Sequence, residues 1–303
     1  MRSPSHEAGG RLKILVTGAK GLLGRAVAQE VGGRGHTLRA AAREELDLTD
    51  EEALLRTFVR ENPDWVVNCA AYTDVDGAES DRAAAFQVNA DGAGAVARTC
   101  SRVGAGLLHV STDYVFDGAS SRPCRPGDPT RPLNVYGASK RAGEERVLAS
   151  GVRHIVVRTS WLYGGRGRGF VGMIQRLARE QDTIRIVADQ RSRPTRSVSL
   201  ARAIVDLLER ESAGDRRNRS GPRIFHWGGG GSATWFELAR ETLVIEGLQT
   251  RLLAISSAEV ERPARRPAYS VLDLRETEAL LGRPAPHWRE ELARYLAETS
   301  TSR

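Results

Sequence analysis

The 303-residue sequence has no apolar run near the ~20 residues that a membrane-spanning helix needs. Its first residues are polar and lack the apolar core of a signal peptide, so we expect residues 1–11 to form a disordered extension. Cysteine is scarce as well: Cys69, Cys100 and Cys124 are odd in number and lack the spacing of metal ligands. We therefore expect a cytoplasmic protein with no membrane partner and no bound metal.

Lysine is also rare, with Lys13, Lys20 and Lys140 standing against 42 arginines. Where arginine occupies nearly every solvated basic position, a remaining lysine is expected to do what arginine cannot, as a compact point charge on a flexible stem. The net charge is +7, but the basic residues are scattered and are not interleaved with aromatic residues. We expect no nucleic-acid partner, and a small anionic ligand suits the positive charge equally well.

Short apolar runs alternate with helical patterns through the first half of the chain, which is typical of an α/β fold. We predict a Rossmann-type doubly wound parallel sheet with a smaller C-terminal α/β substrate lobe, because the alternation breaks up beyond about residue 160. The predicted sheet strands span residues 12–16, 36–42, 65–71, 106–112 and 155–159. The predicted parts are a dinucleotide-binding domain at residues 12–160 and a mainly substrate-binding lobe at 161–303, from which residues 196–225 return to the first domain.

A glycine-rich turn follows the first predicted strand and opens the first helix. Gly18, Gly21 and Gly24 form a G-x-x-G-x-x-G pattern, in which backbone N–H groups and a helix N-terminus can face a pyrophosphate. A purely structural turn is the alternative, but the position in the first βα unit favours a dinucleotide site. Arg43 lies just past the second predicted strand, where a ribose 2′-phosphate would be met, and favours NADPH over a plain surface role.

Two later predicted strands end in residues that suit a binding crevice. Ala70 and Ala71 are small enough for close approach of a flat cofactor. Thr112 is well placed because binding groups gather at the carboxyl ends of parallel strands. His109 alternates with apolar residues and is expected to be core.

The helical segments between these strands give weaker signals. Asp47 could contact an adenine or cap the helix at 49–60, although Asp50 and Thr49 are better cap candidates. A single helix is predicted at 81–102.

Tyr136 and Lys140 are four residues apart at the start of a helical stretch, so their side chains share a face. A phenol has a pKa near ~10, and a neighbouring ammonium lowers that pKa toward the working range of a proton donor. The alternative is an ordinary first helical turn with an exposed lysine. The scarcity of lysine favours the functional interpretation.

Together these motifs resemble an extended short-chain dehydrogenase/reductase, and more closely the dTDP-4-dehydrorhamnose reductase family. The resemblance runs from about Leu12 to Leu296, with the segments in family order. The motifs that carry it are Thr17-Gly18-x-x-Gly21-x-x-Gly24, Asn68-Cys-Ala-Ala-Tyr-Thr-x-Val75-Asp76-x-x-Glu79, Ser111-Thr112-Asp113-Tyr114-Val115-Phe116-Asp117-Gly118, Tyr136-Gly137-x-x-Lys140, Arg158-Thr-Ser-Trp161-Leu-Tyr-Gly164, Asp189-Gln-x-x-x-Pro-Thr195 and Arg266-Pro-Ala-Tyr-Ser-Val-Leu-Asp273.

The resemblance implies NAD(P)H-dependent reduction of a 4-keto group on a dTDP-4-keto-6-deoxyhexose, first of all dTDP-4-dehydro-L-rhamnose. Tyr136 would protonate the keto oxygen, Lys140 would hold the nicotinamide ribose and lower the tyrosine pKa, and Thr112 would bond at the reacting oxygen. The cofactor would lie against Gly21, Leu22 and Leu23 in the turn from Gly18 to Gly24, Asp47 and Leu48 at the adenine, and Ala70, Ala71, Tyr72 and Thr73 at the nicotinamide half. The sugar would meet Val75, Thr112, Asp113, Tyr114 and Trp161.

Two positions depart from the family pattern. Gly169 precedes Phe170 where asparagine is usual, and Ser192 replaces a usual glycine. Both fall where the nucleotide or sugar is expected, so the same reduction of another dTDP-deoxysugar, in antibiotic sugar biosynthesis, is the close alternative.

Two other classes share this fold by the same resemblance. Nucleotide-sugar epimerases and dehydratases hold NAD tightly and need an added acid/base pair, but no glutamate pair lies beside Asp113 here. The intact set of Thr112, Tyr136 and Lys140 disfavours a non-catalytic regulatory subunit. The choice between NADH and NADPH and the formation of a homodimer stay open.

Overall fold

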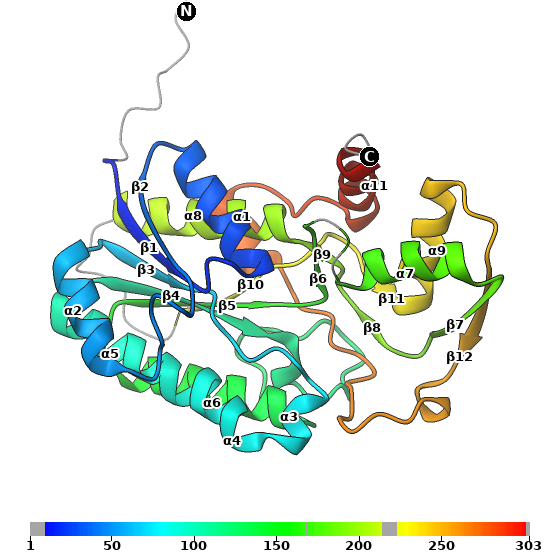
Figure 1. Ribbon diagram of the computed structural model, residues 1–303, viewed down its shortest axis with the longest axis horizontal. Helices are drawn as coiled ribbons and strands as arrows, with labels where there is room; N and C mark the ends of the chain where they lie inside the picture. Colours follow the sequence, from blue (N-terminus) through cyan, green and yellow to red (C-terminus); the bar gives the residue numbers. More distant parts are fainter. Residues whose placement is uncertain (1–9, 166, 168, 214–222, 301–303) are drawn as a thin grey trace, which may run out of the picture.

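Six parallel strands form the main sheet of the computed structural model, which describes residues 10–165, 167, 169–213 and 223–300 (Figure 1). The strand order is β10-β5-β4-β3-β1-β2, as a Rossmann-type α/β sheet requires. The strands are β1 Lys13–Thr17, β2 Thr37–Ala41, β3 Trp65–Asn68, β4 Gly106–Thr112, β5 His154–Thr159 and β10 Ile224–His226.

Helices cover both faces of this sheet, which explains why its central strands are almost continuously apolar. Figure 1 shows α1 and α8 above the sheet and α2, α5 and α6 below it. Each face buries its own cluster, with Val16 and Val27 in the upper one and Leu15 and Phe58 in the lower one. These helices are α1 Leu22–Gly33, α2 Glu51–Glu61, α5 Ala93–Val103, α6 Val135–Ala149 and α8 Ser197–Ala213.

The sheet has its switch point between β1 and β3. From β1 the chain runs through α1 to β2 on one side, and then through α2 to β3 on the other side. Ligands of open α/β sheets bind in the crevice at the carboxyl ends of the two strands that flank such a point. The ends of β1 and β3 are Thr17 and Asn68, which are directly opposite in the register.

Two boundaries differ from the sequence predictions. Strand β3 stops at Asn68, before the predicted residue 71, because the Asn68 side chain accepts a hydrogen bond from the Ala70 backbone N–H at 3.2 Å. The single helix predicted at 81–102 is wrong. It is divided into α4 Arg82–Phe86, a π-helix η1 Gln87–Gly92 and α5, after a short α3 Gly77–Ser80. Such π-helical turns often occur at functional sites.

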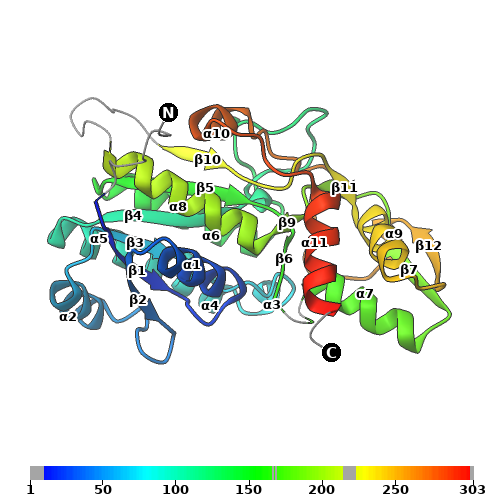
Figure 2. The same cartoon turned by 90° about the horizontal axis from the view of Figure 1, so that it is seen from above.

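A smaller lobe adjoins the carboxyl edge of the sheet, with α11 between the sheet and the outer helices of the lobe (Figure 2). Apolar clusters around Trp288 and Ile174 hold it together. Its elements are β6 Leu162–Tyr163, α7 Gly169–Glu180, β7 Thr183–Val187, β8 Arg191–Ser192, β9 Thr195–Arg196, β11 Ala233–Thr234, α9 Trp235–Glu246, β12 Arg251–Ile255 and α11 Trp288–Ser300, with the 3-10 turn η3 Ser257–Glu259. The 3-10 turn η2 Asp113–Val115 follows β4 and packs on α6, and α10 Arg275–Leu281 packs on β10 and α8 of the sheet domain.

The chain returns from this lobe to the sheet, where α8 packs on α1 and β10 pairs with β5. Within the predicted returning segment 196–225, residues 214–222 lie outside the described residues, as do residues 1–9 of the predicted extension. The division near residue 160 stays a prediction. No helix in the described ranges has the length and apolar character to cross a membrane.

Candidate active site

Tyr136 and Lys140 lie on the first two turns of α6, whose start is fixed by a side-chain cap. The Asn134 side chain accepts a hydrogen bond from the Gly137 N–H at 2.7 Å, which satisfies one free donor of the helix end. Lys140 is 2% exposed, so the alternative of an ordinary exposed lysine is wrong. Tyr136 is half-buried.

The Lys140 ammonium faces β4. Its Nζ donates to the Val110 carbonyl at 2.7 Å and lies 3.4 Å from His109 Nε2. Burial lowers the pKa of Lys140 to about 8, although Glu144 opposes this shift. Glu144 is itself held by a bidentate ion pair with Arg158 on β5, at 2.7 and 2.9 Å.

Thr112 joins Tyr136 to the end of β4. The Thr112 hydroxyl acts to lower the pKa of the Tyr136 phenol, and the Tyr114 ring packs edge-on against the Tyr136 ring at 5.9 Å. Burial raises the pKa of Tyr136 to about 12, opposite to the direction expected from a lysine neighbour. The reason is geometric, because the contacts of Lys140 are with β4 and its ammonium is not among the charges that shift Tyr136.

Asp113 is a buried carboxylate that connects this cluster to the lobe. It accepts from Thr112 and from Ser192 at 3.1 Å each, and also from Ser270. Burial raises the pKa of Asp113 to about 6, against the opposing effect of these hydroxyls. Ser192, which departs from the family pattern, therefore shares the Asp113 carboxylate with Thr112.

The glycine turn at the switch point fits a dinucleotide diphosphate. Gly18 has φ +65°, and a Cβ there would lie 2.7 Å from Ala70 Cα, so the crevice admits only a bare backbone. A Cβ on Gly24 would lie 2.2 Å from the Gly18 carbonyl oxygen, so α1 packs close to the turn. No side chain caps α1 at Gly21, which leaves the N–H groups of Leu22 and Leu23 available to a phosphate.

The residues predicted to lie at the adenine end differ in how much of each is available to a ligand. Arg43 is exposed two residues past β2. The Asp47 carboxylate accepts from the backbone and hydroxyl of Thr49 at 2.9 and 2.8 Å, while Asp50 is the cap of α2, bonded to Ala53 N–H. The side chain of Leu48 is buried in the lower core, so Leu48 could offer only backbone to a ligand.

Asn89, which the sequence reasoning missed, ties the predicted nicotinamide segment to α6. Its amide pairs with the backbone N–H and carbonyl of Tyr72 at 2.9 and 3.0 Å, and also donates to Ser139 on α6 at 2.9 Å. Ala70, Ala71 and Tyr72 are half-buried along this segment, and Thr73 is exposed. The sequence did offer one signal for this residue, because a polar asparagine on the apolar side of a predicted helix needs hydrogen-bond partners when it is buried.

The predicted sugar contacts come from two sides. Val75 is half-buried next to Asp76, whose carboxylate pairs with Arg266. Trp161 lies just past β5 with φ 42°, a left-handed conformation that is strained for a tryptophan, and its ring stacks on Trp235 of α9 at 3.5 Å. Arg266 also donates to the Ala264 carbonyl at 2.6 Å, and it was predicted only as part of a motif and not as a site residue.

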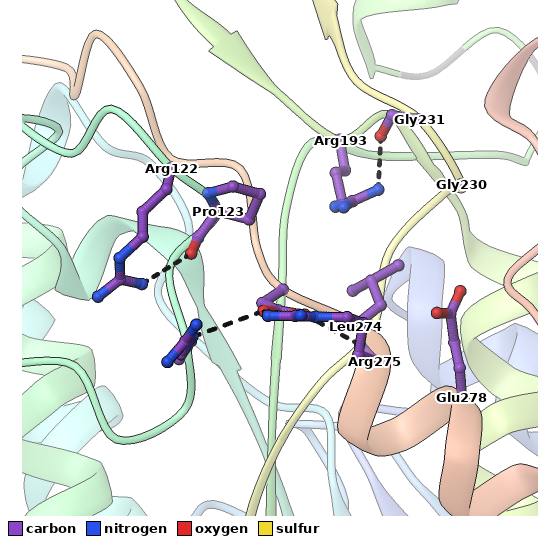
Figure 3. Close-up of a pocket in the computed structure, with 10 residues that line it drawn as sticks. Arg122, Pro123, Arg193, Gly230, Gly231, Leu274, Arg275 and Glu278 are labelled. Carbon is purple, nitrogen blue, oxygen red and sulfur yellow. Dashed lines mark hydrogen bonds and ion pairs between the residues drawn. The ribbon is translucent and has the colours of Figure 1, made fainter.

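A cavity of about 520 Å³ lies near α10 and contains none of these residues (Figure 3). Its charged lining is four arginines and two acids, namely Arg122, Arg125, Arg193, Arg275, Asp273 and Glu278. The arginines are held by protein groups, as Figure 3 shows for Arg122 on the Pro123 carbonyl and Arg193 on the Gly231 carbonyl. The crevice at the switch point is therefore the better candidate for redox chemistry.

Comparisons with known proteins agree with this geometry. The dTDP-4-dehydrorhamnose reductase of Mycobacterium tuberculosis is 42% identical over 302 residues, which cover 97% of this chain and 96% of that protein. The dTDP-4-keto-6-deoxy-D-glucose reductase of Streptomyces niveus is 37% identical over 283 residues, which cover 92% and 94%.

The same relationship holds among solved structures. A dTDP-4-dehydrorhamnose reductase from Bacillus anthracis, in complex with NADP, matches with a TM-score of 0.88 at 34% identity, covering 95% of this chain and 100% of that one. The family described as the RmlD substrate binding domain matches residues 12–301. The chain therefore belongs to the RmlD substrate binding domain family.

Proposed function

We propose that this protein uses NADPH or NADH to reduce the 4-keto group of a dTDP-4-dehydro-6-deoxyhexose, with dTDP-4-dehydro-L-rhamnose as the substrate. The observation that carries the proposal is the packing of Tyr136 against Tyr114, next to the Thr112 hydroxyl at the carboxyl end of β4, in a sheet whose switch point bears a bare glycine turn. The names of the relatives in M. tuberculosis and B. anthracis support the same chemistry.

The cofactor, when bound, supplies a hydride to C4 of the sugar. The backbone between Gly18 and Gly24 would hold the diphosphate, and the small residues Ala70 and Ala71 would leave room for a flat ring. As the carbonyl π electrons move onto oxygen, the Tyr136 hydroxyl gives its proton to that oxygen, and the product is an alcohol. Because burial raises the pKa of Tyr136, the phenol is fully protonated at neutral pH and ready to act as the acid.

Thr112 and Asp113 orient that acid. The Thr112 hydroxyl donates to Asp113 at 3.1 Å and accepts from the Tyr114 N–H at 3.2 Å, which leaves one lone pair to accept from Tyr136 or a sugar hydroxyl. A positioned general acid contributes roughly 10²–10⁴ in rate.

Reduction of another dTDP-deoxysugar, as in antibiotic sugar biosynthesis, is the second candidate. It is favoured by the Ser192 hydroxyl on Asp113, where the family pattern has glycine, and by the relative in S. niveus that is named for a different ketosugar. A serine at this place narrows the room around the buried carboxylate and changes which sugar hydroxyl can reach it.

The test is oxidation of NADPH or NADH, followed by absorbance, with a panel of dTDP-4-ketosugars and NMR of each product. We expect turnover with at least one of them, and we expect Tyr136→Phe to lose ~10²-fold or more in kcat. Tyr163→Phe is the matched control, because the buried Tyr163 hydroxyl has no hydrogen-bond partner to lose. No oxidation with any ketosugar in the panel refutes the proposal.

We further propose a cytoplasmic enzyme that forms a homodimer. As for a bound metal, no group of three or more His, Cys, Asp or Glu side chains in the described ranges is placed to hold a metal ion. Light scattering of the purified protein tests the dimer, and cell fractionation tests the location.

A further inference from the structure

A row of buried, hydrogen-bonded polar side chains crosses the sheet on the face that α6 covers, and this polar chain ends at Lys140. Thr17 on β1, Asn68 on β3 and His109 on β4 are each exposed by 1% or less, and they are joined in that order by contacts of 2.7 and 3.2 Å. His109 Nε2 then lies 3.4 Å from Lys140 Nζ. His109 is therefore core, as the sequence predicted, but it also touches the lysine, and the proposed reaction gives it no task.

The direction of the hydrogen bonds in this chain follows from one backbone group. The Ala70 N–H can only donate, and it lies 3.2 Å from the Asn68 side-chain oxygen, which also accepts from the Thr17 hydroxyl at 2.7 Å. The Asn68 amide nitrogen must then face His109 Nδ1, at 3.2 Å, and donate to it. His109 Nδ1 is thus an acceptor, so the neutral ring carries its proton on Nε2.

The Nε2–H group points at Lys140. An ammonium has three donors and no acceptor, so it would meet this N–H donor to donor. A neutral amine has one lone pair, and it can accept from His109 Nε2–H while still donating to the Val110 carbonyl at 2.7 Å. The geometry of the chain therefore favours the neutral amine. Burial acts in the same direction on Lys140, and it lowers the pKa of His109 well below its usual value, which keeps the ring neutral.

We propose that His109, held as its Nε2–H tautomer by Asn68, is a positioning residue that stabilises the neutral amine of Lys140 and so couples cofactor binding to proton uptake. The inference rests on the proposed function, together with the role that the family resemblance implies for Lys140, which is to hold the nicotinamide ribose as an ammonium. To do so, Nζ must leave the His109 ring for the crevice and gain a proton from solvent.

Other charged and titratable groups around Lys140 do not replace this role. Glu144 favours the ammonium, but its charge is already shared with Arg158 in a buried pair. Burial raises the pKa of the Cys69 thiol to about 12, and that of the Tyr136 phenol to about 12, so both are neutral in the working range. His109 is the group among these that presents a donor to Nζ.

The first test reads the tautomer directly. Nitrogen-15 NMR of imidazole-labelled full-length protein should show the His109 proton on Nε2, with no titration between pH 6 and 9. A proton on Nδ1, or a charged ring in that range, overturns the proposal without any variant. This measurement does not depend on turnover.

The second test measures NADPH affinity against pH by fluorescence titration. We expect affinity to fall above about pH 8 in the unchanged protein, as the proton for Lys140 becomes harder to gain. His109→Phe removes the opposing donor and keeps a flat ring, so the alkaline limb should move up by about one pH unit, a ~10-fold gain in affinity at the top of the range. An alkaline limb that stays in place in a folded His109→Phe variant overturns the proposal.

His154→Phe is the matched control for this substitution. The His154 ring lies at the amino end of β5, bonded to the Val152 carbonyl at 2.8 Å, on the opposite edge of the sheet from the crevice. In the His154→Phe variant, the fall of NADPH affinity at alkaline pH should occur at the same pH as in the unchanged protein. If neither NADPH nor NADH binds at any pH, the proposed function falls instead, so the two failures are distinguishable.

Discussion

Helix α6 packs against the π-helix η1 at Gly143 with no room for a side chain, and an alanine there offers a sharp test of how the site is positioned. A Cβ at Gly143 would lie 2.1 Å from the Asn89 carbonyl oxygen, a rigid backbone atom. Because such contacts are not found below about 3.0 Å, the two helices must separate by about 1 Å. The displaced helix carries Tyr136 and Lys140, and the opposing helix carries the Asn89 amide that holds Tyr72.

The magnitude follows from two opposing terms. Alanine in place of glycine gains up to ~1 kcal/mol in helix propensity, whereas overpacking a close contact costs typically ~1–3 kcal/mol. Gly143→Ala should therefore be less stable by as much as ~2 kcal/mol. The effect on catalysis should be larger, because a shift of about 1 Å in a catalytic group can cost ~10²-fold in rate.

The assay pairs urea unfolding with kcat on the best ketosugar, and it uses Gly32→Ala as the control. Gly32 is helical near the end of α1, and a Cβ there meets nothing within 4 Å. This control should gain up to ~1 kcal/mol and keep its activity. If Gly143→Ala were as stable and as active as Gly32→Ala, the close packing of α6 on η1 would not position the site, and our reasoning would be wrong.

Two further predictions concern buried charges. Glu144→Ala leaves the Arg158 guanidinium, which is 3% exposed, without its carboxylate partner, and it should lower the free energy of unfolding in urea by ~3–5 kcal/mol. Glu145→Ala is the control, because it breaks an exposed pair with Arg141 and should lower that free energy by less than ~1 kcal/mol. Equal losses in the two variants would contradict this prediction. Because the pKa of Asp113 is raised from 3.8 to about 6, the native state binds more protons than the unfolded state between these values, so stability should fall by about 3 kcal/mol as pH rises through that window. Asp113→Asn should lack this fall, and parallel curves for the two proteins would refute it.

Local features of the fold were well predicted from the sequence. Strand β4 has its predicted bounds at residues 106–112, because an apolar run between glycine and hydroxyl residues leaves little choice. The glycine turn lies where the βα pattern places it. The π-helix was missed because its residues differ from an α-helix only in hydrogen-bond register, to which composition is blind.

Contacts between distant segments were beyond the sequence reasoning. Ser192 and Ser270 meet Asp113 across more than 75 residues, and no local pattern marks that meeting. The expected direction of the Tyr136 pKa was wrong for the same reason, since spacing on a helix places Lys140 on the right face but does not say what its ammonium meets on β4. The roles assigned to the individual site residues stay predictions.

The burial of Lys140 has a practical consequence for anyone who attaches this protein to a surface or a dye. Amine-reactive reagents can reach Lys13 and Lys20, which are exposed, but not Lys140. Lys20 lies inside the glycine turn, and its ammonium contacts only Glu44, at 3.1 Å, among the carboxylates of the described residues. Lys13 lies at the amino end of β1, whereas a group attached to Lys20 past its carboxyl end would crowd the dinucleotide crevice, so a terminal tag is the better handle.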